Sequence, residues 1–181
     1  MKFKFFISIF LLGLLCISAY KKADPGSVII QTRFNNRLVD LKQDLQTLLN
    51  LAQQKKQTKE HQKTLREHYL KLRQSYKAWE YLADWLDPYF IKEQINAAPL
   101  PKLEQNSFGL NIIQAQGMQV IDEIVFDDSL LYKSDVLSAE INKTIIALRD
   151  YTNYKIYDAD VFIANRMSLI RMFAISASGF D

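Results

Sequence analysis

The spacing of apolar residues constrains the fold of this chain more than any other feature. Between positions 28 and 52 they recur every three or four residues, which is the period of a helix with one buried face. The same period returns between 65 and 86, between 134 and 152, and from 158 onward. The first stripe contains Val28, Ile30, Phe34, Leu38, Leu41, Leu45, Leu48, Leu49 and Ala52. The sequence therefore predicts four long amphipathic helices.

Turn-forming residues are too few for the main alternatives to a helical fold. The 181 residues contain only 5 Gly and 4 Pro, whereas a sandwich or barrel needs a turn about every 8–12 residues. Residues 90–95 and 116–126 fit shorter helices, and 102–115 have no clean period and are predicted to be irregular. Thr58 is the expected cap of the second long helix, and Asp87 with Pro88 should end it. We expect an all-α, antiparallel bundle of four long helices with one or two short ones, over residues 28–181.

The N-terminus has the pattern of a secretory signal peptide. Lys2 and Lys4 precede an unbroken apolar run from position 5 to 20, which is a short basic segment followed by an apolar core. Cleavage after Ala19 would leave residues 20–27 as a polar spacer with a turn signal. The sequence thus predicts export to the periplasm, with no membrane span in the mature form.

Two alternatives keep the protein at the membrane. The apolar run is only just shorter than the roughly 20 residues of a membrane span, so an uncleaved signal would act as an anchor. Cys16, the single cysteine, would be the lipidated residue of a lipoprotein. Cleavage at either position removes Lys2 and Lys4 and leaves 23 − 2 = 21 basic and 20 acidic residues. The mature domain is therefore near neutral, and this balance argues against nucleic acid as a partner.

No enzyme motif is present. His61 and His68 are seven residues apart, about 10 Å along a helix, and lie in a Lys- and Gln-rich segment where solvated histidines are expected. The chain contains no HExxH, GxSxG, GxGxxG or Walker-type motif. We therefore expect a protein that is not an enzyme by itself, with no catalytic residues.

Acidic and aromatic residues gather in the second predicted helix. Glu80 and Asp84 are four residues apart on one face, next to Trp79 and Trp85. They are candidates for a ligand or partner surface. The alternative is that the two carboxylates only pair with neighbouring basic side chains, and that the aromatic residues belong to the core and its margin.

Two segments resemble a known family. They are 76–89 (YKAWEYLADWLDPY) with 98–104 (APLPKLE), and 117–126 (GMQVIDEIVF). Together they resemble the imelysin-like helical domain found N-terminal to exported di-haem cytochrome c peroxidase-type proteins. Imelysin-like proteins are exported helical bundles with a GxHxxE motif that is associated with iron-related function.

The motif falls on Gly117, Gln119 and Asp122. Only the glycine matches, because Gln119 replaces the histidine and Asp122 the glutamate. A glutamine amide is a poor metal ligand beside imidazole, so we assign no metal ligand in this chain. The peroxidases carry CxxCH haem sites, and none occurs through Asp181. The resemblance implies that haem c belongs only to a region beyond this sequence.

Two functions follow from these observations. The first is an exported, non-catalytic accessory domain that docks or positions a haem-bearing peroxidase domain, in the same or a separate chain. The alternative is an imelysin-like periplasmic protein that binds iron or a small ligand near Glu80, Asp84 and Asp122.

Overall fold

The structure is a computed structural model that describes residues 26–54, 56, 58–98, 100–106, 109–130, 133–149, 151 and 154–178. It is mostly helical, as predicted. The expected signal peptide, Cys16 and most of the expected spacer lie outside the described residues. The first described helix begins at Gly26, two residues before the predicted start of the bundle domain at residue 28.

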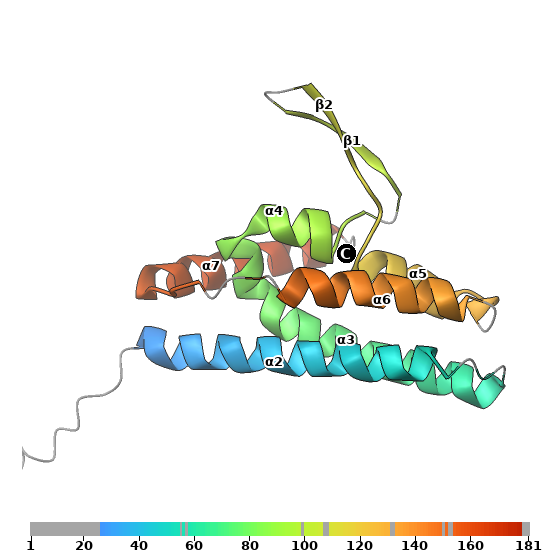
Figure 1. Ribbon diagram of the computed structural model, residues 1–181. Helices are drawn as coiled ribbons and strands as arrows, with labels where there is room; N and C mark the ends of the chain where they lie inside the picture. The colour runs from blue at the N-terminus through green and yellow to red at the C-terminus, as the bar shows by residue number, and fades with distance from the viewer. Residues whose placement is uncertain are drawn as a thin grey trace, which may run out of the picture.

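Of the described helices four are long, and the other described elements are short. Figure 1 shows α3 running back along α2, with α5 and α6 packed near them and a β-hairpin that projects away from the helices. The elements are α2 (Gly26–Ala52), α3 (Lys59–Leu86), α4 (Pro88–Phe90), the π-helix η1 (Ile91–Ile95), β1 (Lys102–Asn106), β2 (Gly109–Ile113), α5 (Met118–Phe126), α6 (Ser134–Arg149) and α7 (Asp158–Ser178).

The apolar stripes of α2 and α3 form most of the core. The α2 stripe is buried from Phe34 to Ala52, as its spacing predicted, whereas Val28 at its predicted start is 49% exposed. Trp79 of α3 is fully buried; its ring stacks on Phe34 at 5.7 Å between centroids and meets the edge of Tyr151 at 5.2 Å. The core therefore includes α2, α3 and the segment after α6 in one continuous cluster.

Both predicted boundaries of α3 are confirmed. The Thr58 hydroxyl accepts a hydrogen bond from the His61 backbone N–H at 3.2 Å, which caps the first turn. At the other end, the Asp87 carboxylate accepts from the Phe90 backbone N–H at 3.1 Å, and Pro88 begins α4. The proline cannot supply the N–H that would continue α3, so the chain turns there.

Residues 102–115, predicted to be irregular, instead contain an antiparallel hairpin. Leu103 pairs with Ile112, and Gln105 with Leu110. Opposed residues lie on the same face of a two-stranded ladder, so Leu103, Leu110 and Ile112 share one face, and all three are exposed. Each strand has only five residues, too few for alternation to stand out in the sequence.

The histidine prediction is wrong for His61. This residue lies four before Leu65 on α3, so it falls on the same inward stripe and is only 7% exposed. Its Nε2 has no hydrogen-bond partner among the described residues. His68 is half-buried, and its Nδ1 lies 2.9 Å from the Thr64 carbonyl oxygen.

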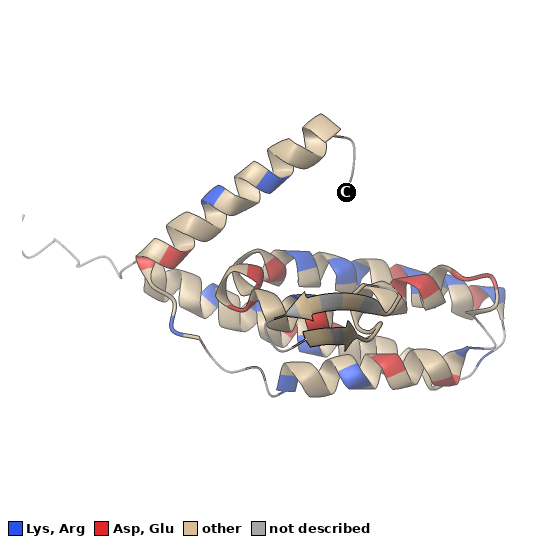
Figure 2. Ribbon diagram, turned by 90° about the horizontal axis from the view of Figure 1, so that it is seen from above, with Lys and Arg blue, Asp and Glu red and all other residues tan. Residues whose placement is uncertain are grey.

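The last helix buries much less than its apolar pattern suggested. Only Ala164 of α7 is buried, and Figure 2 shows the helix leaving the other helices at an angle. Phe162 and Phe173 are each 70% exposed, and Leu169 and Ile170 about half exposed. Apolar residues lie all around α7, so periodicity alone did not indicate which side meets α3. Ala164 and the half-buried Val161 lie against the core and Arg171 reaches Asp84 of α3, whereas the four large apolar residues named above are exposed.

Candidate functional site

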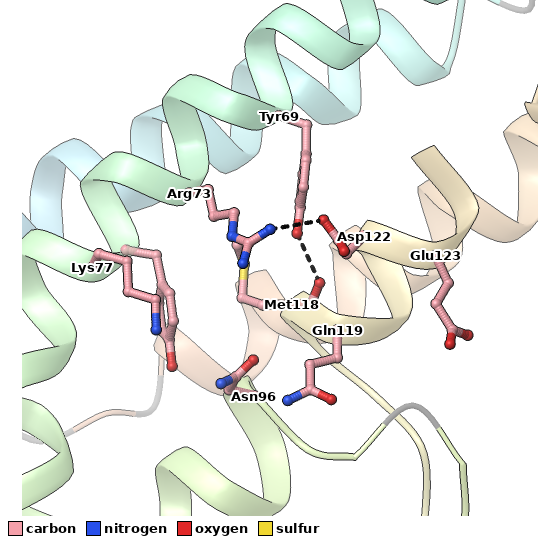
Figure 3. Close-up of a pocket in the computed structure, with 9 residues that line it drawn as sticks. Tyr69, Arg73, Lys77, Asn96, Met118, Gln119, Asp122 and Glu123 are labelled. Atoms are coloured by element: carbon pink, nitrogen blue, oxygen red, sulfur yellow. Dashed lines mark hydrogen bonds and ion pairs between the residues drawn. The ribbon is translucent and has the colours of Figure 1, made fainter. Parts of the chain in front are cut away.

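A cavity of about 360 Å³ opens between the middle of α3, the end of η1 and the start of α5 (Figure 3). Its walls are mainly polar, and they combine cationic, anionic and amide side chains. The residues that line it are Tyr69, Arg73, Tyr76, Lys77, Asn96, Met118, Gln119, Asp122 and Glu123.

Gly117 sets the position of α5 against η1. Its φ is +80° and its ψ is −149°, and it forms a β-bridge with Asn96. A Cβ at this position would lie 2.1 Å from the Ile95 carbonyl oxygen, so only glycine fits. The Gly117 N–H donates to Oε1 of the buried Glu140 at 2.7 Å. This close contact places the first turn of α5, with Gln119 and Asp122, at the cavity.

The two cations of the cavity come from α3 and keep donors available. Arg73 Nη1 lies 3.3 Å from Asp122 Oδ1, and this is its one ion pair among the described residues. Lys77 Nζ lies 2.8 Å from Glu80 Oε2. Both basic side chains are about half exposed, so these pairs are screened and contribute about 0–1 kcal/mol each. A guanidinium has five N–H donors and an ammonium three, which leaves donors for a ligand.

Two tyrosines form the inner wall and remain protonated. Tyr69 donates its hydroxyl hydrogen to the Met118 carbonyl oxygen at 3.1 Å, and Tyr76 donates to Glu80 Oε1 at 2.7 Å. Burial raises the pKa of Tyr69, and the Asp122 charge raises it further. Burial also raises the pKa of Tyr76, with Glu80 as the next cause. These hydroxyls therefore anchor helices and are poor nucleophiles.

The three positions of the resembled motif lie together. Gln119 and Asp122 line the cavity, and Gly117 immediately precedes their helix. In Figure 3 the Gln119 amide lies beside Asn96, while Asp122 points toward Arg73. The structure thus brings the motif positions to one site, where Asp122 is already paired with a cation.

The structure does not bring the four candidate residues of the second helix, Trp79, Glu80, Asp84 and Trp85, together at one site. Glu80 is 7% exposed and is held by Tyr76 and Lys77, next to the cavity but outside its lining. Trp79 faces the core. Asp84 and Trp85 line a different cavity, of about 260 Å³, against α7. There Asp84 accepts a hydrogen bond from Arg171 at 2.5 Å, which joins α3 to α7.

Sequence reasoning missed several lining residues, above all Arg73 and Lys77. A signal for them existed, because Tyr69, Arg73 and Lys77 follow one another at intervals of four and therefore share one face of α3. What the sequence did not indicate is that α5 lies against this face. Asn96 carried no signal, because its place at the cavity depends on its bridge to Gly117. Glu123 directly follows Asp122, and both line the cavity.

The described part of the chain contains no group of three or more His, Cys, Asp or Glu side chains arranged to hold a metal ion. Within the same residues, no helix combines the length and apolarity needed to cross a membrane. No known protein family, curated protein or solved structure compared with this chain matches it.

Proposed function

We propose that this protein is an exported, non-catalytic binding domain of the imelysin-like kind, an antiparallel four-helix bundle that follows a signal peptide. Its ligand is a small compound bearing carboxylate groups, bound in the cavity between α3 and α5. One observation carries this proposal: Arg73 and Lys77 point spare donors into a cavity whose other rim offers the Asn96 and Gln119 amides.

The charge pattern favours a carboxylate chelate of iron over bare iron. Arg73 pairs with the Asp122 carboxylate, and Tyr76 and Lys77 hold Glu80. Glu123 is then the one lining carboxylate without a described ion pair, so no set of several oxygen ligands converges in the described cavity. Guanidinium and ammonium groups bind carboxylates through charge-assisted hydrogen bonds. An anionic chelate would bring its own metal ligands, and the cavity would hold only its outer carboxylates.

Calorimetry on the domain from residue 20 tests this function. Citrate and ferric citrate are expected to bind wild-type protein, and Arg73→Gln should weaken both at least tenfold. Arg33→Gln is the matched control, because Arg33 is exposed on α2, away from the cavity. Tight binding of bare ferrous ion, or equal affinity of Arg73→Gln and wild type, would contradict the proposal.

A second candidate is docking to a haem-bearing peroxidase domain. The observation that favours it is the apolar outer face of α7, formed by Phe162, Leu169, Ile170 and Phe173, which no other described element covers. Exposed apolar surface of this kind marks interaction sites. Sedimentation of the domain with a di-haem cytochrome c peroxidase should show a complex that Phe162→Ser/Phe173→Ser disrupts. Equal complex formation by the double variant would count against docking through α7.

A further inference from the structure

The side of α7 that faces away from the core is an apolar stripe with one cation in its middle. Its residues lie three or four positions apart or next to each other, so they share one side of the helix. We call this side the outer face of α7, and its residues are Phe162, Arg166, Leu169, Ile170 and Phe173. All five side chains are exposed, so the whole stripe is open to an occupant.

The charges of α7 select what kind of occupant fits. From Val161 to Ser178 the helix contains two arginines and no acidic residue, and Figure 2 shows acidic residues of α7 only at its base. Arg171 pairs with Asp84 of α3, whereas Arg166 forms no ion pair within the part of the chain that the structure describes. An occupant of the outer face must therefore supply both apolar contact and an anion.

A lipid surface supplies both, and a second copy of α7 does not. Packed against its own copy, the outer face would place the Arg166 guanidinium among apolar side chains or against the same arginine, with no carboxylate to pair with. In a bilayer, phosphates lie directly above the acyl chains. An arginine among apolar residues can therefore extend its charged end to the phosphates while its stem stays with the apolar side chains.

The start of α7 lies where the chain arrives from its apolar N-terminal run. The Ser27 N–H of α2 donates to Asp158 Oδ1 of α7 at 2.9 Å. Gly26 follows Tyr20, the last residue of the apolar run, by six positions, which span at most about 20 Å. In the uncleaved form that the sequence leaves open, a membrane anchor would thus hold the start of α7 close to the lipid surface.

The residues at the base of α7 fit the same surface. Lys155 and Tyr157 precede the helix and are exposed, and Lys155 Nζ lies 5.3 Å from the centroid of the Tyr157 ring. Tyrosine and lysine are side chains that lie at the level of lipid headgroups. The carboxylates of Asp158 and Asp160 bond instead to a backbone N–H of α2 and to the indole of α3.

We propose that the outer face of α7 binds the surface of a bilayer that contains anionic lipids. The helix lies parallel to the membrane plane, with its two phenylalanines, Leu169 and Ile170 between the headgroups and the upper acyl chains. Arg166 binds a lipid phosphate. The cavity between α3 and α5 takes no part in this contact, so the membrane proposal and the carboxylate proposal stand or fall separately.

Vesicle sedimentation tests the proposal with the protein from residue 20, which lacks the apolar run and keeps the described core between Phe34 and Ala164. Vesicles of phosphatidylglycerol and phosphatidylethanolamine should bind it about fivefold more strongly than phosphatidylcholine vesicles. Phe162→Ser/Phe173→Ser should lower the partition coefficient at least tenfold. Leu103→Ser/Leu110→Ser is the matched control, because it removes two exposed apolar side chains from the hairpin and should leave binding unchanged.

Arg166→Gln separates the phosphate contact from apolar insertion. It should weaken binding to the anionic vesicles about fivefold and leave binding to phosphatidylcholine as in wild type. Lys63→Gln removes the same charge at an exposed position near the turn between α2 and α3 and should change neither. All these variants alter exposed side chains, so their melting temperatures should match that of wild type.

Several results would overturn the proposal. They are no binding of wild-type protein at millimolar lipid, equal binding of wild type and the double phenylalanine variant, or an equal effect of Arg166→Gln and Lys63→Gln. Sedimentation without lipid distinguishes the protein occupants of this face. A dimer, or a complex with the haem-bearing domain, that the double phenylalanine variant abolishes while vesicles stay unbound would assign the outer face to protein and overturn the lipid assignment.

Discussion

At Gly117 the backbone adopts a conformation that side chains with a Cβ rarely tolerate, and it lies against the Ile95 carbonyl. This one residue couples three elements. Its bridge to Asn96 joins η1, its N–H bonds to Glu140 of α6, and α5 begins directly after it. The glycine of the resembled motif thus has a structural reason to be there that does not depend on metal binding.

Gly117→Ala should lower the free energy of unfolding by at least about 3 kcal/mol, because backbone strain adds to a backbone clash. Gly109→Ala is the matched control: its φ is +125°, but nothing lies within 4 Å of an added Cβ, so its loss should be about 1 kcal/mol. Urea unfolding of both variants measures the difference. Equal losses would show that strain alone, and no clash, operates at Gly117.

Asp127 gives a pH-dependent contribution at the end of α5. Its carboxylate accepts from Lys133 Nζ at 2.8 Å, from the Ser129 N–H at 2.6 Å and from the Ser129 hydroxyl. The Lys133 and Ser129 hydrogen bonds hold the pKa of Asp127 well below its usual range. A carboxyl group with a lowered pKa stabilises the fold above its unfolded pKa, about 4, and loses this contribution as pH falls.

Asp127→Asn should therefore destabilise the protein at pH 7 and make its stability fall less steeply between pH 5 and pH 2. The measurement is the urea midpoint at several pH values. Asp128→Asn makes the same change in charge at the next residue and is the control. It should leave the fall of stability with pH as in wild type. An Asp127→Asn curve parallel to that of wild type would contradict this account.

At the scale of elements, α7 and the hairpin both present apolar side chains to solvent. In α7, Ala164 is buried, Val161 packs half-buried against the core, and Arg171 pairs with Asp84 of α3. The outward residues therefore contribute little to the stability of the isolated chain.

Phe173→Gln should change the free energy of unfolding by less than about 0.5 kcal/mol, because the side chain is 70% exposed. Leu48→Ala, which empties a fully buried position of α2, should cost about 3 kcal/mol. Chemical denaturation compares the two variants. A loss above about 1 kcal/mol for Phe173→Gln would mean that α7 packs more deeply than described.

For the whole molecule, burial is unevenly distributed. α2, α3, α5 and α6 contribute to one core cluster, whereas the second half of α7 has no buried residue. Cooperative units with few buried contacts open at a lower free energy than the core. The molecule should therefore open first at α7.

Amide hydrogen exchange checks this expectation. The slowest exchange should occur around Leu45 and Leu48 of α2 and around Leu72 and Trp79 of α3, where side chains are fully buried. Residues 165–178 should exchange fastest among the helices. Uniform protection of α7 and α3 would contradict the uneven stability, and protection of α7 that rises with protein concentration would indicate self-association.

Apolar spacing predicted the helical class and the α2 and α3 stripes, and the capping residues predicted both ends of α3. Both signals depend only on residues that are close in sequence. Apolar spacing failed where position depends on distant segments. His61 is a different case, because it continues the local stripe of Leu65 and was mispredicted from the Lys- and Gln-rich composition around it. The hairpin pairs residues that carry no helical period. The candidate cavities lay beyond periodicity for the same reason.

Local spacing along the chain is enough to predict the long helices and the buried sides of α2 and α3, since amphipathicity is a local property. It also placed Gly117, Gln119 and Asp122 close together in one short helix. Local spacing does not predict that this helix lies against Arg73, that Tyr151 is buried near Asp87, or that the large apolar residues of α7 are exposed. Those outcomes depend on how distant elements pack, and packing is determined by the shape and volume of the whole core.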